Sequence, residues 1–397
     1  MDIHSTCQCM RRKNPKDLVC FSNGCDKRTV FTLSKMAYNA CIDIQKKEYN
    51  RIRNAPEVDI QNCCRKILYA IKRDIDLPYG PNHAECIYAY RENFKVACFE
   101  AARVGHMDCL RFAHENGFKW TTRTSKNAAK NGHLDCLEYA FEHGCPYGDT
   151  ILKYSAKGGH LECMEYLYKT GCKLTNLACS AAAEGGFLKC LKFAHEIGCH
   201  WGIKTCTKAA AGGYLDCLIY AHLNGCILTV KTCAAAARGG HLKSLKYAHR
   251  NRCIWNEETT NNAALGGHFK CLVYAQKHGC PLGLNILEKA AIGGSLDCMK
   301  YLYGLGCQIG RLTCATPAKY GNLACLKYCC KIGCEWGINV CSKAAANGHL
   351  ACLIYAHENG CIITSSTYTA AERDGYFNLD CLEYCRKFVD WGECNEA

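Results

Sequence analysis

The sequence lacks the features that mark a membrane protein, a secreted protein or a common enzyme. It has no run of about 18 or more apolar residues, which argues against a membrane-spanning helix. The N-terminus, Met1–Cys7, has no apolar signal-peptide core, so we expect the protein to be intracellular and cytoplasmic. No phosphate-binding loop, no G-x-S-x-G motif and no single pair of carboxylates is present, so we expect neither enzyme activity nor a cofactor.

Runs of one charge are also absent. The formal charge of +13 divides into +6 over residues 1–97 (17 Lys/Arg, 11 Asp/Glu) and +7 over the remainder (32 and 25), and neither part has five consecutive basic residues. A mildly basic surface favours acidic partners but is weak evidence for nucleic-acid binding. We expect a monomer with no membrane partner, and we do not expect nucleic acid to be the partner.

A glycine recurs every 27 residues and organises most of the chain. We call it the anchor glycine, and it stands at Gly105, Gly132, Gly159, Gly186, Gly213, Gly240, Gly267, Gly294, Gly321, Gly348 and Gly375. A second glycine follows most anchors twelve residues later. A period of this size predicts a stacked-repeat architecture, because one such unit cannot bury its own apolar side. It also predicts a long binding surface in place of a single reaction pocket.

Residues 204–230 show what each unit contains. The alanine-rich stretch 205–211 predicts a short first helix, which Gly212 and Gly213 end. From 215 to 222, apolar residues recur at helical spacing and predict a second helix. The unit is therefore helix, turn, helix and loop, repeated about eleven times, and the fold class is all-α.

The units resemble ankyrin repeats. Residues 128–145 read Ala-Ala-Lys-Asn-Gly-His, then Cys-Leu, then Tyr-Ala, and end in Gly-Cys, close to that family's pattern. The match covers about three-quarters of the chain. Two departures are the period of 27, where ankyrin repeats have roughly 33, and the missing Thr-Pro-Leu-His opening. The resemblance implies an ankyrin-like solenoid of stacked helix-turn-helix repeats, with shortened loops in place of β-hairpins. Short cysteine-rich units of this kind also resemble the ankyrin-like proteins of large DNA viruses and some protists.

The two ends depart from the pattern. We expect a helical N-terminal cap or small adaptor module at 1–81, a repeat array at 82–374 and a polar capping repeat at 375–397. An adaptor module would recruit other machinery, such as a ubiquitin ligase in an F-box-like role, although no clear F-box motif is present. A further alternative is a zinc-stabilised module that binds nucleic acid. Its candidate zinc ligands are Cys7, Cys9, Cys20 and Cys25.

The sequence has thirty-seven cysteines, and most of those in the array occupy three recurring positions, seven residues before and four and thirteen residues after the anchor glycine. Equivalent residues of adjacent units lie about 8–10 Å apart, too far for a disulfide, so we expect free thiols that serve as small core residues. Histidine and cysteine also recur three residues apart, as in His133 and Cys136. A catalytic pair would occur once, whereas this pair recurs along the array, so we expect the histidine to tie the turn between the two helices.

Three residues break the pattern. Arg252 replaces a helix-ending glycine, Pro317 replaces an alanine of a first helix, and Ser244 replaces a core cysteine. The first predicts a strained backbone, and the second predicts a bent or shortened helix.

Function is predicted to be non-enzymatic scaffolding of an unknown protein along the repeat surface. The position 18 residues after each anchor glycine varies in chemistry while the core does not, as recognition would require. We therefore expect partner-binding residues at Arg123, Lys204, Lys231, Glu258, Asn285 and Asn339.

Overall fold

The computed structural model describes residues 98–115, 119–308, 310, 314–334, 336–337, 339–372 and 378–388. All regular secondary structure in these residues is helical, and no strand occurs among them. The all-α prediction is confirmed, and loops stand where longer ankyrin units carry hairpins.

Each unit contains a first and a second helix. The first helices are α6 (Thr122–Asn131), α8 (Ile151–Gly158), α10 (Leu177–Gly185), α12 (Thr205–Gly212), α14 (Val230–Arg238), α16 (Glu257–Leu265), α18 (Ile286–Ile292), α20 (Ala315–Lys319), α22 (Val340–Ala346) and α24 (Ser365–Glu372). The second helices are α5 (Met107–Glu115), α7 (Leu134–Glu142), α9 (Leu161–Lys169), α11 (Leu188–Glu196), α13 (Leu215–Leu223), α15 (Leu242–Arg250), α17 (Phe269–Lys277), α19 (Leu296–Gly304), α21 (Leu323–Lys331), α23 (Leu350–Glu358) and α25 (Leu379–Arg386).

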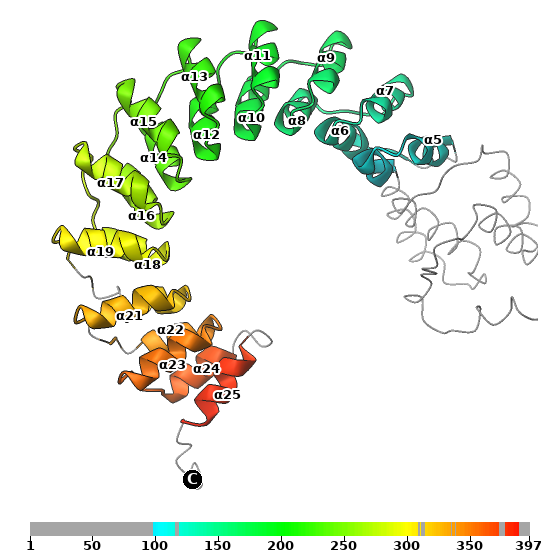
Figure 1. Ribbon diagram of the computed structural model, residues 1–397. Helices are drawn as coiled ribbons and strands as arrows, with labels where there is room; N and C mark the ends of the chain where they lie inside the picture. Colours follow the sequence, from blue (N-terminus) through cyan, green and yellow to red (C-terminus); the bar gives the residue numbers. More distant parts are fainter. Residues whose placement is uncertain are drawn as a thin grey trace, which may run out of the picture.

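The units form an arc with the first helices on its inner side and the second helices on its outer side (Figure 1). Successive first helices contact each other closely, whereas successive second helices contact each other much less. Side-chain size explains the difference, because alanines such as Ala209 and Ala210 are fully buried between first helices. Larger residues, such as Leu218 and Tyr220, separate the second helices. Units that are narrow inside and wide outside stack into a curve.

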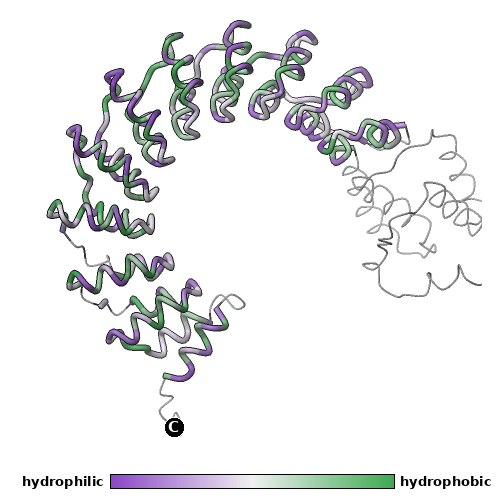
Figure 2. The backbone as a smooth tube through the Cα atoms, in the orientation of Figure 1, coloured by the Kyte–Doolittle hydropathy of each residue, from purple (hydrophilic) through white to green (hydrophobic). Residues whose placement is uncertain are grey.

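The core is one continuous apolar layer between the two rows of helices. Buried leucine, alanine and cysteine side chains from successive units pack into a single cluster. Figure 2 shows hydrophobic and hydrophilic residues alternating along the helices, as expected of elements buried on one side. No helix in the described part of the chain exceeds ten residues, and none is long and apolar enough to cross a bilayer.

The anchor glycine is required by the neighbouring unit as well as by its own turn. Gly105, Gly132 and Gly213 adopt left-handed backbone with φ of 80°, 79° and 76°. A Cβ added at Gly105 would lie 2.2 Å from the ring of His133, the residue that follows the next anchor. His133 Nε2 also donates to the Arg103 carbonyl oxygen (3.2 Å). The histidine therefore joins adjacent units, a contact that the sequence did not predict, and a ring such as that of His160 also lies beside its own turn, 2.5 Å from a Cβ added at Gly158.

Other side chains replace the histidine at this position without losing the contact. The ring of Phe187 covers Gly159, and the ring of Tyr214 covers Gly186. Asn322 Nδ2 donates to the Ala291 carbonyl oxygen (2.8 Å) in the same way as a histidine. A flat ring or amide lying over a glycine is thus a common element of the unit interface.

Most described cysteines are free thiols, as predicted, and the exceptions are Cys109, Cys314 and Cys334, which are disulfide-bonded. Cysteines at the position four residues after the anchor glycine, such as Cys136 and Cys163, are almost fully buried. Burial raises the pKa of both of these thiols to about 12. They are inert core residues, as predicted. Cys314 and Cys334, however, form a disulfide with a Cα–Cα distance of 6.4 Å. Our expectation of free thiols throughout was wrong here, because it compared equivalent positions of adjacent units and overlooked two different positions within one unit.

The three irregular residues behave largely as predicted. Arg252 has a φ of 60°, the left-handed conformation that glycine adopts elsewhere at this position. Helix α20, which contains Pro317, has five residues where most first helices have seven to ten. Ser244 is 1 % exposed, and its hydroxyl has no hydrogen-bond partner among the described residues.

The predicted boundaries at the ends stay predictions. The whole of segment 1–81 lies outside the described residues, as does the start of the array. At the C-terminus, α24 and α25 complete a last unit, and the exposed Arg386 and Lys387 end it.

Replacing the two kinds of glycine separates backbone strain from steric conflict. Gly225→Ala has no atom within 4 Å of the new Cβ, so only its φ of 95° opposes it and we expect a loss of about 1 kcal/mol. At Gly213 the Cβ would lie 2.3 Å from the ring of His241, so Gly213→Ala should lose roughly 1–3 kcal/mol more. Urea unfolding followed by circular dichroism measures both. Equal losses would contradict the role given to the ring contact.

Restoring the missing glycine should stabilise the array. Arg252 is exposed and its left-handed backbone is unfavourable for a side chain, so we expect Arg252→Gly to raise the free energy of unfolding by up to about 1 kcal/mol. The control is Lys246→Gly within α15, which should lower it by about 1 kcal/mol. Destabilisation by Arg252→Gly would show that the arginine side chain contributes more than its strained backbone costs.

Candidate partner-binding surface

The inner side of the arc is the one face of the first helices that no other helix covers. Helix α10, for example, contacts α8 and α12 on its two flanks and its own second helix α11 behind. In α6, the buried residues Thr124, Ser125, Ala128 and Ala129 face this packing. The residues between them are exposed or half-buried on the inner side.

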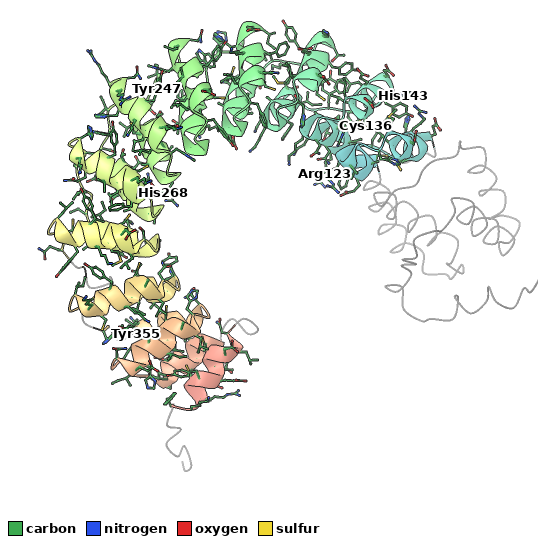
Figure 3. The ribbon with its side chains drawn as sticks, in the orientation of Figure 1. Arg123, Cys136, His143, Tyr247, His268 and Tyr355 are labelled. Carbon is green, nitrogen blue, oxygen red and sulfur yellow. A yellow bond between two sulfur atoms is a disulfide. The ribbon has the colours of Figure 1, made fainter. Side chains whose placement is uncertain are left out.

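All six predicted partner-binding residues are exposed at the N-terminal ends of first helices. Arg123, Lys231 and Glu258 are the second residues of α6, α14 and α16. Lys204, Asn285 and Asn339 are the N-cap residues of α12, α18 and α22. We placed them in loops from the sequence, and the structure moves them to the helix starts. Figure 3 shows Arg123 on the inner side of the arc.

Capping side chains fix the backbone at these positions. Thr121 Oγ1 accepts a hydrogen bond from Arg123 N (3.3 Å), and Asn256 Oδ1 accepts one from Glu258 N (3.1 Å). Cysteines thirteen residues after the anchor reinforce the same end of the unit. The Cys253 thiol donates to the carbonyl oxygen of Thr229, the N-cap of α14 (3.1 Å). Arg123, Lys231 and Glu258 therefore project from capped helix starts, whereas α12, α18 and α22 start without a side-chain cap.

Exposed isoleucines in the loops beside these helix starts were not recognised from the sequence. Ile203, Ile227 and Ile254 lie in three successive loops and are 87 %, 77 % and 75 % exposed. Ile203 immediately precedes Lys204. For Ile227 and Ile254 the signal in the sequence was an apolar side chain at a position where other units carry Pro, Lys or Gln, which the repeat pattern alone does not explain.

On the outer side, a chain of aromatic contacts joins second helices. In five units, the hydroxyl of a tyrosine hydrogen-bonds to Nδ1 of a histidine in the preceding unit, at 2.9–3.1 Å. These pairs are His114–Tyr139, His195–Tyr220, His222–Tyr247, His249–Tyr274 and His357–Tyr384. Figure 3 shows Tyr247 on the outer side of the arc.

Tryptophans complete these contacts and are not free to stack on a ligand. Trp120 stacks on His114 with ring centroids 3.8 Å apart, and Trp255 stacks on His249 at 3.9 Å. Each of these two tryptophans also packs edge-on against the tyrosine of the next unit. All of the described tryptophans pack against the core.

Burial controls the charge of two of these histidines. It lowers the pKa of His114 and of His249, and the neighbouring rings of His143 and His278 lower them further. Both imidazoles are thus held neutral, with Nδ1 as the acceptor for the tyrosine hydroxyl. Gln276 supports this assignment, because its Oε1 accepts from the Tyr301 hydroxyl at the same position (2.8 Å).

Pairs of buried cysteines also lie close together within single units. Within one unit, Cys206 donates a hydrogen bond to Cys226, which lowers the pKa of Cys226 to about 7, while the same contact raises that of Cys206. Cys341 and Cys361 repeat the arrangement. Both members of each pair are nearly inaccessible to solvent, so the pairing is structural.

No group of three or more His, Cys, Asp or Glu residues that could hold a metal ion occurs in the described segments. The candidate zinc ligands Cys7, Cys9, Cys20 and Cys25 lie outside those segments, so this site stays a prediction.

Comparison with known proteins identifies the repeats. Residues 98–178 match the family model for ankyrin repeats in three copies. The later units repeat the same helices and turns, so the described part of the chain is a helical-repeat solenoid, and the ankyrin match itself covers residues 98–178. No curated protein matches the chain.

Solved structures give a weaker likeness. The maize pentatricopeptide repeat protein PPR10 is 14 % identical, with a TM-score of 0.35 over 81 % of this chain and 55 % of that chain. PPR10 in complex with an 18-nt psaJ RNA element is also 14 % identical, with a TM-score of 0.29 over 77 % and 60 %. This chain thus spans little more than half of those chains, and such low scores carry no inference about function.

The depressed histidine pKa predicts a loss of stability in acid. In the unfolded chain the pKa of His249 is about 6.5, which is higher than its pKa in the folded protein. Protons therefore bind the unfolded state preferentially. Stability should be complete above that pH and fall as pH decreases toward the folded pKa. We expect His249→Gln, which copies the natural Gln276 contact, to reduce this loss, as read from urea midpoints at pH 7.5, 6.5 and 5.5. His200→Gln in an exposed loop is the control, and an unchanged pH dependence in His249→Gln would refute the assignment.

Proposed function

We propose that the protein is a non-enzymatic scaffold that binds a protein partner along the inner side of the arc and the loops at its edge. One observation carries the proposal. The interior of the units is nearly constant, while the exposed residues at the starts of the first helices change from unit to unit.

The loop isoleucines support a protein as the partner. Side chains 75–87 % exposed to water gain most from burial against another apolar surface. They lie directly beside charged and polar residues, an arrangement of apolar anchors and polar surroundings that is typical of protein interfaces.

The remaining predictions about cellular role stand as part of this proposal. Many buried cysteines that carry no disulfide suit a reducing, intracellular compartment. Target selection by an N-terminal adaptor would depend on residues 1–81, outside the described segments. An origin in a large DNA virus or a protist stays a prediction.

Site-specific crosslinking tests the binding surface. A photo-reactive amino acid at Ile227 or Lys231 should give discrete protein adducts in the native cell, because these residues face the proposed partner. The same amino acid at Lys189 or Lys243, exposed on second helices, is the matched control and should give none. Adducts of equal yield at both sets, or adducts confined to the second helices, would refute the proposal.

A further inference from the structure

The inner side of the arc carries one sign of charge over its first half. Helices α6, α8, α10, α12 and α14, with their N-cap residues, contain nine cationic side chains and one carboxylate, Glu184. We call the nine the cationic stripe: Arg123, Lys126, Lys130, Lys153, Lys157, Lys204, Lys208, Lys231 and Arg238. All nine are exposed or half-buried.

The stripe ends at a definite place. From α16 onward the described first helices carry four carboxylates and three lysines, beginning with Glu257 and Glu258 at the start of α16. The excess of positive charge is therefore a property of one half of the surface, and the modest net charge of the whole chain conceals it.

Glu184 forms ion pairs with two cations of the stripe that belong to different helices. Its carboxylate pairs with Lys157 of α8 through one oxygen and with Lys208 of α12 through the other (2.6 Å). These pairs lower the pKa of Glu184 and keep it ionised. One carboxylate on α10 thus draws together cations from the units on both sides, and the other seven cations have no counter-ion on these helices.

The scarcity of aromatic side chains on this surface favours a polypeptide over a nucleic acid as the ligand. Proteins that bind single-stranded nucleic acid combine cations with exposed aromatic platforms. Tyr154 is the one aromatic residue of these five first helices, and Lys126 Nζ already lies over its ring (4.4 Å from the centroid). The apolar groups beside the stripe are instead the aliphatic Ile203, Ile227 and Ile254.

The stripe also has a length that an extended peptide can match. Neighbouring packed helices lie about 8–10 Å apart, so the axes of α6 and α14 are separated by roughly 40 Å along the arc. An extended chain rises about 3.3 Å per residue, and about 12 residues cover this distance.

We propose that the cationic stripe binds an acidic, extended segment of the partner, about 12 residues long and rich in Asp and Glu, with aliphatic residues that contact the loop isoleucines. This inference rests on the proposed scaffold function and specifies the chemistry of the partner. Long-range attraction between the two charge patterns speeds encounter, and the isoleucine contacts prolong the bound state.

Binding of a synthetic peptide to the full chain, measured by fluorescence anisotropy, tests the proposal. The probe is a 15-residue peptide of Asp and Glu interspersed with Leu and Gly, and its Asn/Gln counterpart is the uncharged control. The triple variant Arg123→Glu, Lys204→Glu, Lys231→Glu should weaken binding of the acidic probe at least about tenfold. The matched variant Lys189→Glu, Lys243→Glu, Lys270→Glu makes the same charge change on exposed residues of second helices, and should change binding by less than about twofold.

Each outcome decides the proposal. The proposal is supported if the acidic probe binds tightly and only the first triple variant loses this affinity. A higher affinity in the chain carrying Glu184→Gln also supports it. No binding, or equal losses in both variants, overturns it, and so does preferential binding of a 15-nucleotide RNA over the peptide. If crosslinks form at Lys231 in cells while the acidic peptide does not bind, the scaffold function stands and only the acidic partner is refuted.

Discussion

The array depends on a close approach between a flat side chain of one unit and the anchor glycine of the unit before it. The ring of His133 lies where any Cβ at Gly105 would be, and the same contact recurs with phenylalanine, tyrosine or asparagine in place of histidine. Because the glycine also needs a left-handed backbone, two independent constraints fix one residue. This contact holds the turn between the helices and the register of neighbouring units at most of the interfaces, although Ser295 provides no ring over Gly267.

This fixed register gives the protein two different sides. On the outer side, histidine, tyrosine and tryptophan rings satisfy one another, so little of their chemistry is left for a ligand. On the inner side, small alanines bring the first helices close together and present their N-terminal ends in a row. At α6, α14 and α16 the variable side chains stand on capped helix starts. A rigid row lowers the entropic cost of binding an extended partner along it.

Variation within the array is informative because the framework around it is constant. Arg252 and Ser244 each weaken a rule that neighbouring units obey, the first through its backbone and the second through a buried hydroxyl. Neither residue belongs to the cationic stripe. Every side chain of the cationic stripe reaches solvent, so none of them disturbs the packing of the core. The fold therefore does not require these side chains to be charged.

The sequence by itself determined the all-α solenoid and the buried positions, because a 27-residue period repeats each local signal about eleven times. Only the tertiary structure decided which residues of different units meet. It placed the histidine over the anchor glycine of the preceding unit as well as beside its own turn, and it brought together cysteines 20 residues apart, such as Cys314 and Cys334. It also gathered lysines from several first helices onto one side. Such contacts join residues more than one helix apart, and their geometry depends on how the units curve, which periodicity along a single chain does not specify.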